Sequence, residues 1–211
     1  MIDPPWAETP DLTIVIDFAS PHSYLALEPT LKLCEENAFS ARWCQFTGPV
    51  VADPAAYPRE TRSDRHRYFR ARYQRQELAR YAAVQDLDLS ALDDHRPTLD
   101  LAWGLIRVSD LGRDLVPDYL RTAFRCYWQR EPVDGAAVRG LLDDMGLESD
   151  DRGEAHDTDL EDRMQAIDTY LKNLGIFNTP TYLIGEELFI GRAHLPMIRW
   201  ILQGRTGQPP I

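Results

Sequence analysis

The feature that most constrains the fold is a short apolar strand that leads directly into a helix start. Residues 12–18 read LTIVIDF, a β-branched apolar run that is typical of a buried strand. Ser20 and Pro21 follow, and this pair is typical of the N-cap and first position of a helix. Residues 39–46 indicate a second strand. Strand, helix and strand at this spacing predict a βαβ unit with two parallel strands and a right-handed crossover.

The rest of the chain is mostly helical until a hairpin near its end. Helices are predicted at 60–84, 97–109, 113–128, 134–145, 159–174 and 194–203, and a hairpin at 179–191. Pro29 is expected to kink or divide the first helix. Without the central helices, the element order is that of a thioredoxin fold. We therefore predict an α/β thioredoxin-like fold with an inserted all-helical domain. Its predicted boundaries are 1–58 and 157–211 for the discontinuous thioredoxin-like domain and 59–156 for the insertion.

Composition narrows the classes of partner. The net charge of −11 argues against nucleic acid as the main partner, and the small-molecule substrate that is expected instead rests on the family resemblance described below. No apolar run reaches the length of about 18 residues that a membrane span needs. The N-terminal segment lacks the basic start and apolar stretch of a secretory signal, which predicts a cytoplasmic protein. The three cysteines, Cys34, Cys44 and Cys126, form no C-x-x-C motif, so neither a disulfide framework nor a metal site is predicted.

The predicted strand end and helix start around Ser20 form the first candidate site. Ligands of open α/β sheets bind at the carboxyl ends of strands, and a helix N-terminus offers free N–H groups and partial positive charge. The Ser20 hydroxyl cannot exchange electrons as a thiol does, but it can donate a hydrogen bond to a thiolate. A plain N-cap remains the alternative role. His22 should favour its neutral form there and could carry a proton; the alternative is a neutral surface histidine.

Three segments carry a family resemblance that extends from about residue 12 to residue 203. Ser20-Pro21-His22-Ser23 resembles the Cys-Pro-His-Cys active site of DsbA-type oxidoreductases, with serine in place of both cysteines. The longer segment DFASPHSYLA resembles the opening of the 2-hydroxychromene-2-carboxylate isomerase and kappa-class glutathione transferase family. Arg80-Tyr81-Ala82 is similar to that family's R-W-A, and residues 175–181 are similar to the G-V-F-G-V-P-T segment that holds a cis-proline.

The resemblance implies a glutathione-dependent isomerase acting on an unsaturated or aromatic carboxylate. Ser20 would hold the glutathione sulfur, while Thr179, before a cis Pro180, would offer its main chain to the cofactor. The related proteins are commonly homodimers. The sequence departs from the family at Ala193, where an aspartate usually holds the γ-glutamyl amine. It departs again at Asp53, which precedes a proline where the family has asparagine. Glutathione could therefore bind weakly, bind differently or not bind.

Arginines form the remaining candidate group. Eight of them lie between residues 59 and 80 against three acidic residues, a local net charge of +5. Most are interpreted as a solvated face that pairs with the acidic stretch 143–162, and Arg80 is the candidate for a site role. Arg192, beside His194, would suit an anionic ligand.

Two alternative functions stay open, a kappa-class-like glutathione transferase and a redox-inactive DsbA-like binding module. The missing cysteines contradict a dithiol oxidoreductase.

Overall fold

A four-stranded mixed sheet forms the centre of the molecule. The computed structural model describes residues 4–6, 8–147 and 155–210. The strands are β1 (Leu12–Ile16), β2 (Ala41–Gln45), β3 (Thr181–Ile184) and β4 (Glu187–Ile190), in the spatial order β2-β1-β3-β4. β1 and β2 are parallel, whereas β1–β3 and β3–β4 are antiparallel. The predicted βαβ unit and the predicted terminal hairpin are both confirmed.

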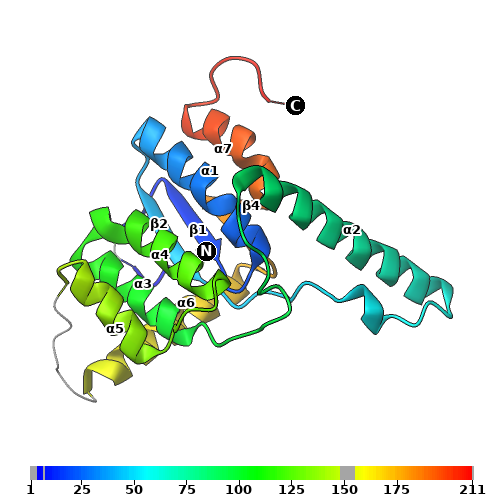
Figure 1. The fold of residues 1–211 in the computed structure, drawn as a ribbon. Coiled ribbons are helices and arrows are strands. Elements are labelled where there is room, and N and C mark those ends of the chain that lie inside the picture. The colour runs from blue at the N-terminus through cyan, green and yellow to red at the C-terminus, as the bar shows by residue number, and fades with distance from the viewer. Residues whose placement is uncertain (1–3, 7, 148–154, 211) are drawn as a thin grey trace.

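The helices follow the predicted order along the chain (Figure 1). They are α1 (Pro21–Asn37), α2 (Arg62–Gln85), α3 (Leu99–Leu111), α4 (Val116–Trp128), α5 (Gly135–Asp144), α6 (Ala155–Asn173) and α7 (Leu195–Leu202). Short 3-10 turns lie at Pro54–Ala56, Arg113–Leu115 and Arg192–His194. Within the described residues, no helix is both long and apolar enough to cross a membrane.

Alternation along β1 explains how the sheet is covered on both faces. Leu12, Ile14 and Ile16 belong to the large core cluster that includes Leu27 and Leu31 of α1. Val15 points to the other face, into a smaller cluster with Leu171 of α6. The large cluster also takes in α3 and α4, with Leu105 and Phe124 among its members. These two inserted helices therefore share the core of the sheet domain and have no separate core of their own.

α1 is a single helix that contains Pro29, so of the two expected effects of this proline, a kink or a division, the division does not occur. A proline has no N–H to donate to the carbonyl of residue i−4, which here is Leu25. The Leu25 carbonyl instead accepts a hydrogen bond of 3.2 Å from Nε2 of Gln85, at the end of α2. The inserted helix thus replaces the donor that Pro29 lacks.

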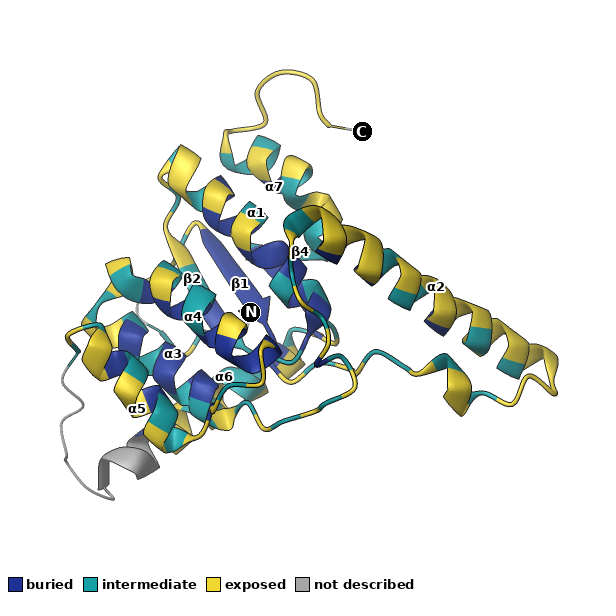
Figure 2. Ribbon diagram, in the orientation of Figure 1, coloured by how far each residue is buried: buried dark blue, intermediate teal, exposed yellow. Residues whose placement is uncertain are grey.

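α2 is placed very differently from the other helices. It extends outward from the body of the molecule, and most of its surface is exposed (Figures 1 and 2). Only Ala71, Leu78 and Ala82 are buried, and they lie on one face at helical spacing. The inner end of α2 packs on α1, where Leu78 and Ala82 form a cluster with Leu25.

Candidate functional site

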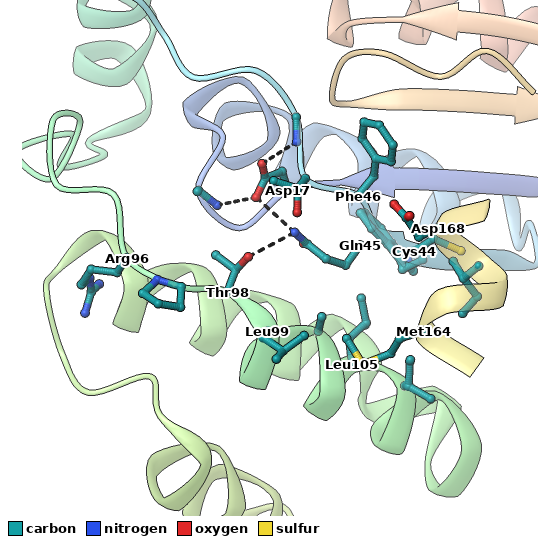
Figure 3. Close-up of a pocket in the computed structure, with 18 of the residues that line it drawn as sticks. Asp17, Cys44, Gln45, Phe46, Arg96, Thr98, Leu99, Leu105, Met164 and Asp168 are labelled. Carbon is teal, nitrogen blue, oxygen red and sulfur yellow. Dashed lines mark hydrogen bonds between the residues drawn. The ribbon is translucent and has the colours of Figure 1, made fainter. Parts of the chain in front are cut away.

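Asp17, directly after β1, organises the end of the sheet. Its buried carboxylate accepts three hydrogen bonds, to Oδ1 from Ala19 N and Gln45 Nε2 and to Oδ2 from Gly48 N, at 2.9, 3.1 and 2.9 Å (Figure 3). Its carbonyl accepts from Ser20 N at 2.9 Å. Asp17 therefore fixes the turn that presents Ser20. Sequence reasoning assigned Asp17 no role, although a carboxylate at the end of an apolar strand was a usable signal.

Ser20 is the N-cap of α1. Its Oγ accepts a 3.3 Å hydrogen bond from Ser23 N, and its carbonyl accepts from Tyr24 N at 3.0 Å. Ser20 therefore acts as a plain helix N-cap in this structure. Its side chain is buried, with 7% of the residue exposed. Among the described residues, no acceptor is found for the Ser20 hydroxyl proton or for the main-chain N–H of His22. Two donors thus remain at the N-terminus of α1, where the helix dipole favours an anion.

His22 lies in the first turn of α1 and is partly buried. Burial lowers the pKa of His22 below its ordinary value, the Glu77 carboxylate raises it, and the Arg192 guanidinium lowers it. The predicted preference for the neutral form agrees with this direction. The main cause is desolvation rather than the helix terminus. Glu77 lies on α2 and Arg192 follows β4, so charges from both segments influence the pKa of His22.

Thr179 and Pro180 lie at the same end of the sheet as Asp17. The antiparallel register pairs Val15 with Thr181, and its continuation sets Asp17 opposite Thr179. The Thr179–Pro180 peptide bond is cis, the geometry that the resemblance implied. Thr179 N donates to Asn178 Oδ1 at 2.8 Å, so this N–H is already paired within the loop. The buried Thr179 Oγ1 has no hydrogen-bond partner among the described residues.

Arg192 is the last member of the group that we call the Ser20 cluster, which consists of Ser20, His22, Thr179, Pro180 and Arg192. Gly191 N donates to Pro180 O at 2.8 Å, which holds the start of the Arg192 turn against the loop. The Arg192 guanidinium lies over the ring of Tyr81 of α2, 3.7 Å from its centroid. Arg192 forms no ion pair with any described carboxylate. A stacked guanidinium without a carboxylate partner is suited to bind an anionic group.

Arg80 and Asp53 are not part of this cluster. Arg80 is exposed, donates from Nε to Gln76 O of its own helix, and lies over Tyr73. Since Leu78 and Ala82 face the body, Arg80 lies on the opposite side of α2. Its neighbour Tyr81, which was not proposed as a site residue, contacts Arg192 instead.

Asp53 caps the short turn at Pro54–Ala56, where its exposed carboxylate accepts from Ala55 N at 2.9 Å. The hydrogen bond to Asp93 is the main cause that raises the pKa of the Arg75 guanidinium on α2, and the Asp53 carboxylate adds a smaller effect in the same direction. Arg75 itself pairs with Asp93 and donates to Ala52 O at 3.1 Å. The side chains of residues 148–159 lie outside the described part of the structure, so the pairing of the arginines with the acidic stretch 143–162 stays a prediction.

A cavity of about 640 Å³ opens on the other side of Asp17, at the edge of β2 (Figure 3). Its walls come from β2, α3 and α6, and Asp17, Ala19 and Gly48 form its inner end. Ser20, His22, Thr179 and Arg192 are not among its lining residues. The molecule therefore has two adjacent features at this end of the sheet, the Ser20 cluster and the β2-edge cavity, which meet at Asp17.

Comparison with known proteins identifies the family. A family model described as a DSBA-like thioredoxin domain matches residues 11–203, so the chain belongs to the DsbA-like thioredoxin family. The predicted thioredoxin-like fold is thereby confirmed. Among curated proteins, no match to this chain was found.

Solved structures show the same fold at low sequence identity. A 2-hydroxychromene-2-carboxylate isomerase is 18% identical, with a TM-score of 0.60, over 92% of this chain and 94% of that one. The cytosolic disulfide reductase DsbM from Pseudomonas aeruginosa, solved with GSH, is 16% identical, with a TM-score of 0.60, over 92% and 98%. The thiol-disulfide exchange protein α-DsbA2 from Wolbachia pipientis is 13% identical, with a TM-score of 0.55, over 95% and 83%. At these identities the similarity establishes the fold alone.

Proposed function

We propose that the protein is a glutathione-dependent isomerase of the 2-hydroxychromene-2-carboxylate isomerase type, acting on an unsaturated or aromatic carboxylate. The observation that carries the proposal is a pair of donors at the start of α1, the Ser20 hydroxyl and the main-chain N–H of His22, for which the described residues supply no acceptor. Ser20 stands where the Cys-Pro-His-Cys site of a DsbA-type protein has its first cysteine. A serine there can hold a sulfur that a cofactor brings, although it cannot itself exchange a disulfide.

The residues of the cluster fit glutathione at its sulfur and less well at its amino end. The two donors and the α1 terminus suit a thiolate. No donor to the Thr179 C=O is found in the described part of the chain, which leaves this carbonyl for a cysteinyl N–H, whereas the Thr179 N–H is already bonded to Asn178 Oδ1. Ala193 offers no carboxylate to a γ-glutamyl amine. Arg192 would instead pair with a carboxylate, so the tripeptide would bind mainly by its sulfur and its negative charges.

Each residue of the cluster has a distinct part in this proposal. Glutathione, when bound, would supply a sulfur that adds reversibly to one carbon of a double bond. The bond is then single and can rotate until the sulfur leaves. Ser20 would donate a hydrogen bond from its hydroxyl to the sulfur and stabilise the thiolate, together with the main-chain N–H of His22. The neutral His22 imidazole can accept or return a proton close to the substrate. Arg192, held over Tyr81, binds the substrate or cofactor carboxylate.

A kappa-class-like transferase would use the same held thiolate, so the assay must separate the two activities. An isomerase returns glutathione unchanged, whereas a transferase consumes it as a conjugate. Measuring free thiol during turnover distinguishes these outcomes. The homodimer that the resemblance implies stays a prediction, which light scattering of the purified protein tests.

A redox-inactive binding module is the second candidate. The paired Thr179 N–H favours it, because main-chain pairing with a thiol peptide would then rest on the carbonyl alone. Such a module would bind an anionic ligand through Arg192 without turnover. It predicts saturable binding of a carboxylate peptide with no dependence on the Ser20 hydroxyl.

Calorimetric titration with reduced glutathione tests the proposal directly. Ser20→Ala removes a hydrogen bond to a charged sulfur, so affinity is expected to fall about tenfold or more. Ser109→Ala is the matched control, because it removes the same hydroxyl from α3, where the group bonds only to Leu105 O of its own helix. Glutathione affinity should be unchanged in this control.

Two results would contradict the proposal. One is the absence of binding by the wild-type protein at millimolar glutathione. The other is equal affinity in a folded Ser20→Ala variant, which would leave the hydroxyl as a helix cap alone and favour the binding module.

A further inference from the structure

We propose that the β2-edge cavity is a second small-molecule site, separate from the Ser20 cluster, for an uncharged and largely apolar ligand. Its volume of about 640 Å³ falls within the range of roughly 300–1,000 Å³ that is usual for small-molecule sites. Three features carry the inference, namely the apolar walls, the commitment of its charged groups to other partners, and the open edge of β2.

Apolar side chains from three elements form the walls. Trp43, Cys44 and Phe46 come from β2 and its end, Leu99, Ala102, Leu105 and Ile106 from α3, and Met164 and Ile167 from α6. Figure 3 shows Leu99 and Leu105 on α3 with Met164 on α6 around the space that Cys44 and Phe46 border. Leu99 is exposed (66%), so apolar surface continues to the mouth. A ligand here would remove apolar surface from water on three sides.

The charged groups that line the cavity already have partners. The Asp17 carboxylate is held by Ala19, Gln45 and Gly48. Asp168 pairs with Lys172 at 2.6 Å.

Arg96, another lining residue, donates from Nη1 and Nη2 to main-chain carbonyls at and just after the end of α4, including Glu131 O at 2.6 Å. Its buried Nε has no hydrogen-bond partner among the described residues. Two further titratable groups belong to the lining. His95 is exposed, and burial raises the pKa of the Cys44 thiol, which keeps that thiol neutral. Because a charged ligand group buried without a partner is costly, the cavity favours an uncharged ligand.

The open edge of β2 offers hydrogen bonds to such a ligand. β2 is the outermost strand and pairs with β1 only. Ser40 O and Phe46 N bond to β1, so the parallel ladder turns the main-chain groups of Trp43 and Gln45 toward the open edge. No hydrogen bond to these outward groups is found among the described residues. An amide or carbonyl beside an apolar body would pair with them.

Fluorescence titration with the neutral dye N-phenyl-1-naphthylamine tests the site. Saturable binding with one site per chain is expected. Ile106→Trp, which places an indole among the wall residues, should weaken it about tenfold or more. Met164→Trp fills the cavity from α6 and should act in the same direction, which covers the case of a variant that does not fold.

Leu111→Trp is the matched control, because Leu111 is exposed on the same helix as Ile106 but does not line the cavity. Its affinity should equal that of the wild type.

Charge and position are tested in the same assay. The anionic dye 8-anilinonaphthalene-1-sulfonate should bind more weakly than the neutral one, and Ser20→Ala should leave neutral-dye binding unchanged. The proposal is overturned if the wild type shows no saturable binding, if folded Ile106→Trp and Met164→Trp bind as tightly as the control, or if the anionic dye binds more tightly. Since none of these outcomes involves glutathione, they are independent of the function proposed for Ser20.

Discussion

α1 and α2 contribute to the same cluster but are held in opposite ways. α1 buries eight of its 17 residues, and its Thr30 hydroxyl lies 2.9 Å from the Tyr182 hydroxyl of β3. α2 buries three of its 24 residues and extends into solvent (Figure 2). Ser20 and His22 are therefore fixed by the central core, whereas Glu77 and Tyr81 depend on the narrow inner face of α2.

This difference in packing separates the residues that we propose hold the sulfur from those that we propose select the ligand. The groups proposed to hold sulfur lie on the strongly packed helix, where positional precision matters most. Tyr81, whose ring lies against the Arg192 guanidinium that we propose to bind an anion, lies on the weakly packed helix. Substitutions on α2 should therefore alter what binds without unfolding the sheet domain. Gln85 is the connection between the two helices, through the Leu25 carbonyl that Pro29 leaves without a donor.

Removing core volume under α1 should give the largest effect. Leu31, 2% exposed, packs between α1 and the sheet, so Leu31→Ala is expected to lower the free energy of unfolding by about 3 kcal/mol. Val84→Ala, on α2, removes an apolar side chain that is 83% exposed and should change it by less than about 0.5 kcal/mol. Urea unfolding measures both. Similar losses in the two variants would refute the contrast between the helices.

Removing the cap of α2 should have a smaller and local effect. Thr61 and Asp64 form a capping box, with Asp64 N donating to Thr61 Oγ1 at 3.1 Å. Thr61→Ala should destabilise the first turns by about 1 kcal/mol. Amide exchange in the first turns of α2 should accelerate about fivefold, while the global free energy of unfolding changes little. A global loss of the full amount would show that the outer half of α2 unfolds together with the core.

The smallest expected effect is on the titration of His22. Glu77 raises the pKa of His22 and Arg192 lowers it, so Glu77→Gln should lower this pKa further and Arg192→Gln should raise it. An NMR titration of the imidazole protons measures both changes. A pKa of His22 that does not respond to Glu77→Gln would mean that α2 does not reach the site in solution.

The same shift affects stability in acid. The folded-state pKa of His22 lies below its unfolded value, so the unfolded chain binds the proton first as the pH falls. Stability should therefore decrease as the pH falls below about 6.5, until His22 is also protonated in the folded chain. Glu77→Gln should enlarge this loss, and urea unfolding at a series of pH values measures it.

Much of the framework follows from local patterns in the sequence. The run LTIVIDF, the Ser20-Pro21 pair and the terminal hairpin are each set by residues close together in the chain, and all were found where they were predicted. The N-cap role of Ser20 belongs to the same class, because an N-cap bond spans only three residues.

Contacts between distant segments were decided only by the tertiary structure. The sequence placed Arg80 in the site by its motif, but packing of Leu78 and Ala82 on α1 turned Arg80 outward and brought its neighbour Tyr81 to Arg192. The β2-edge cavity likewise needs α3 and α6 to meet one strand edge. Sequence periodicity specifies which face of a helix is apolar, but not which distant surface that face will cover, and the function of a side chain depends on that surface.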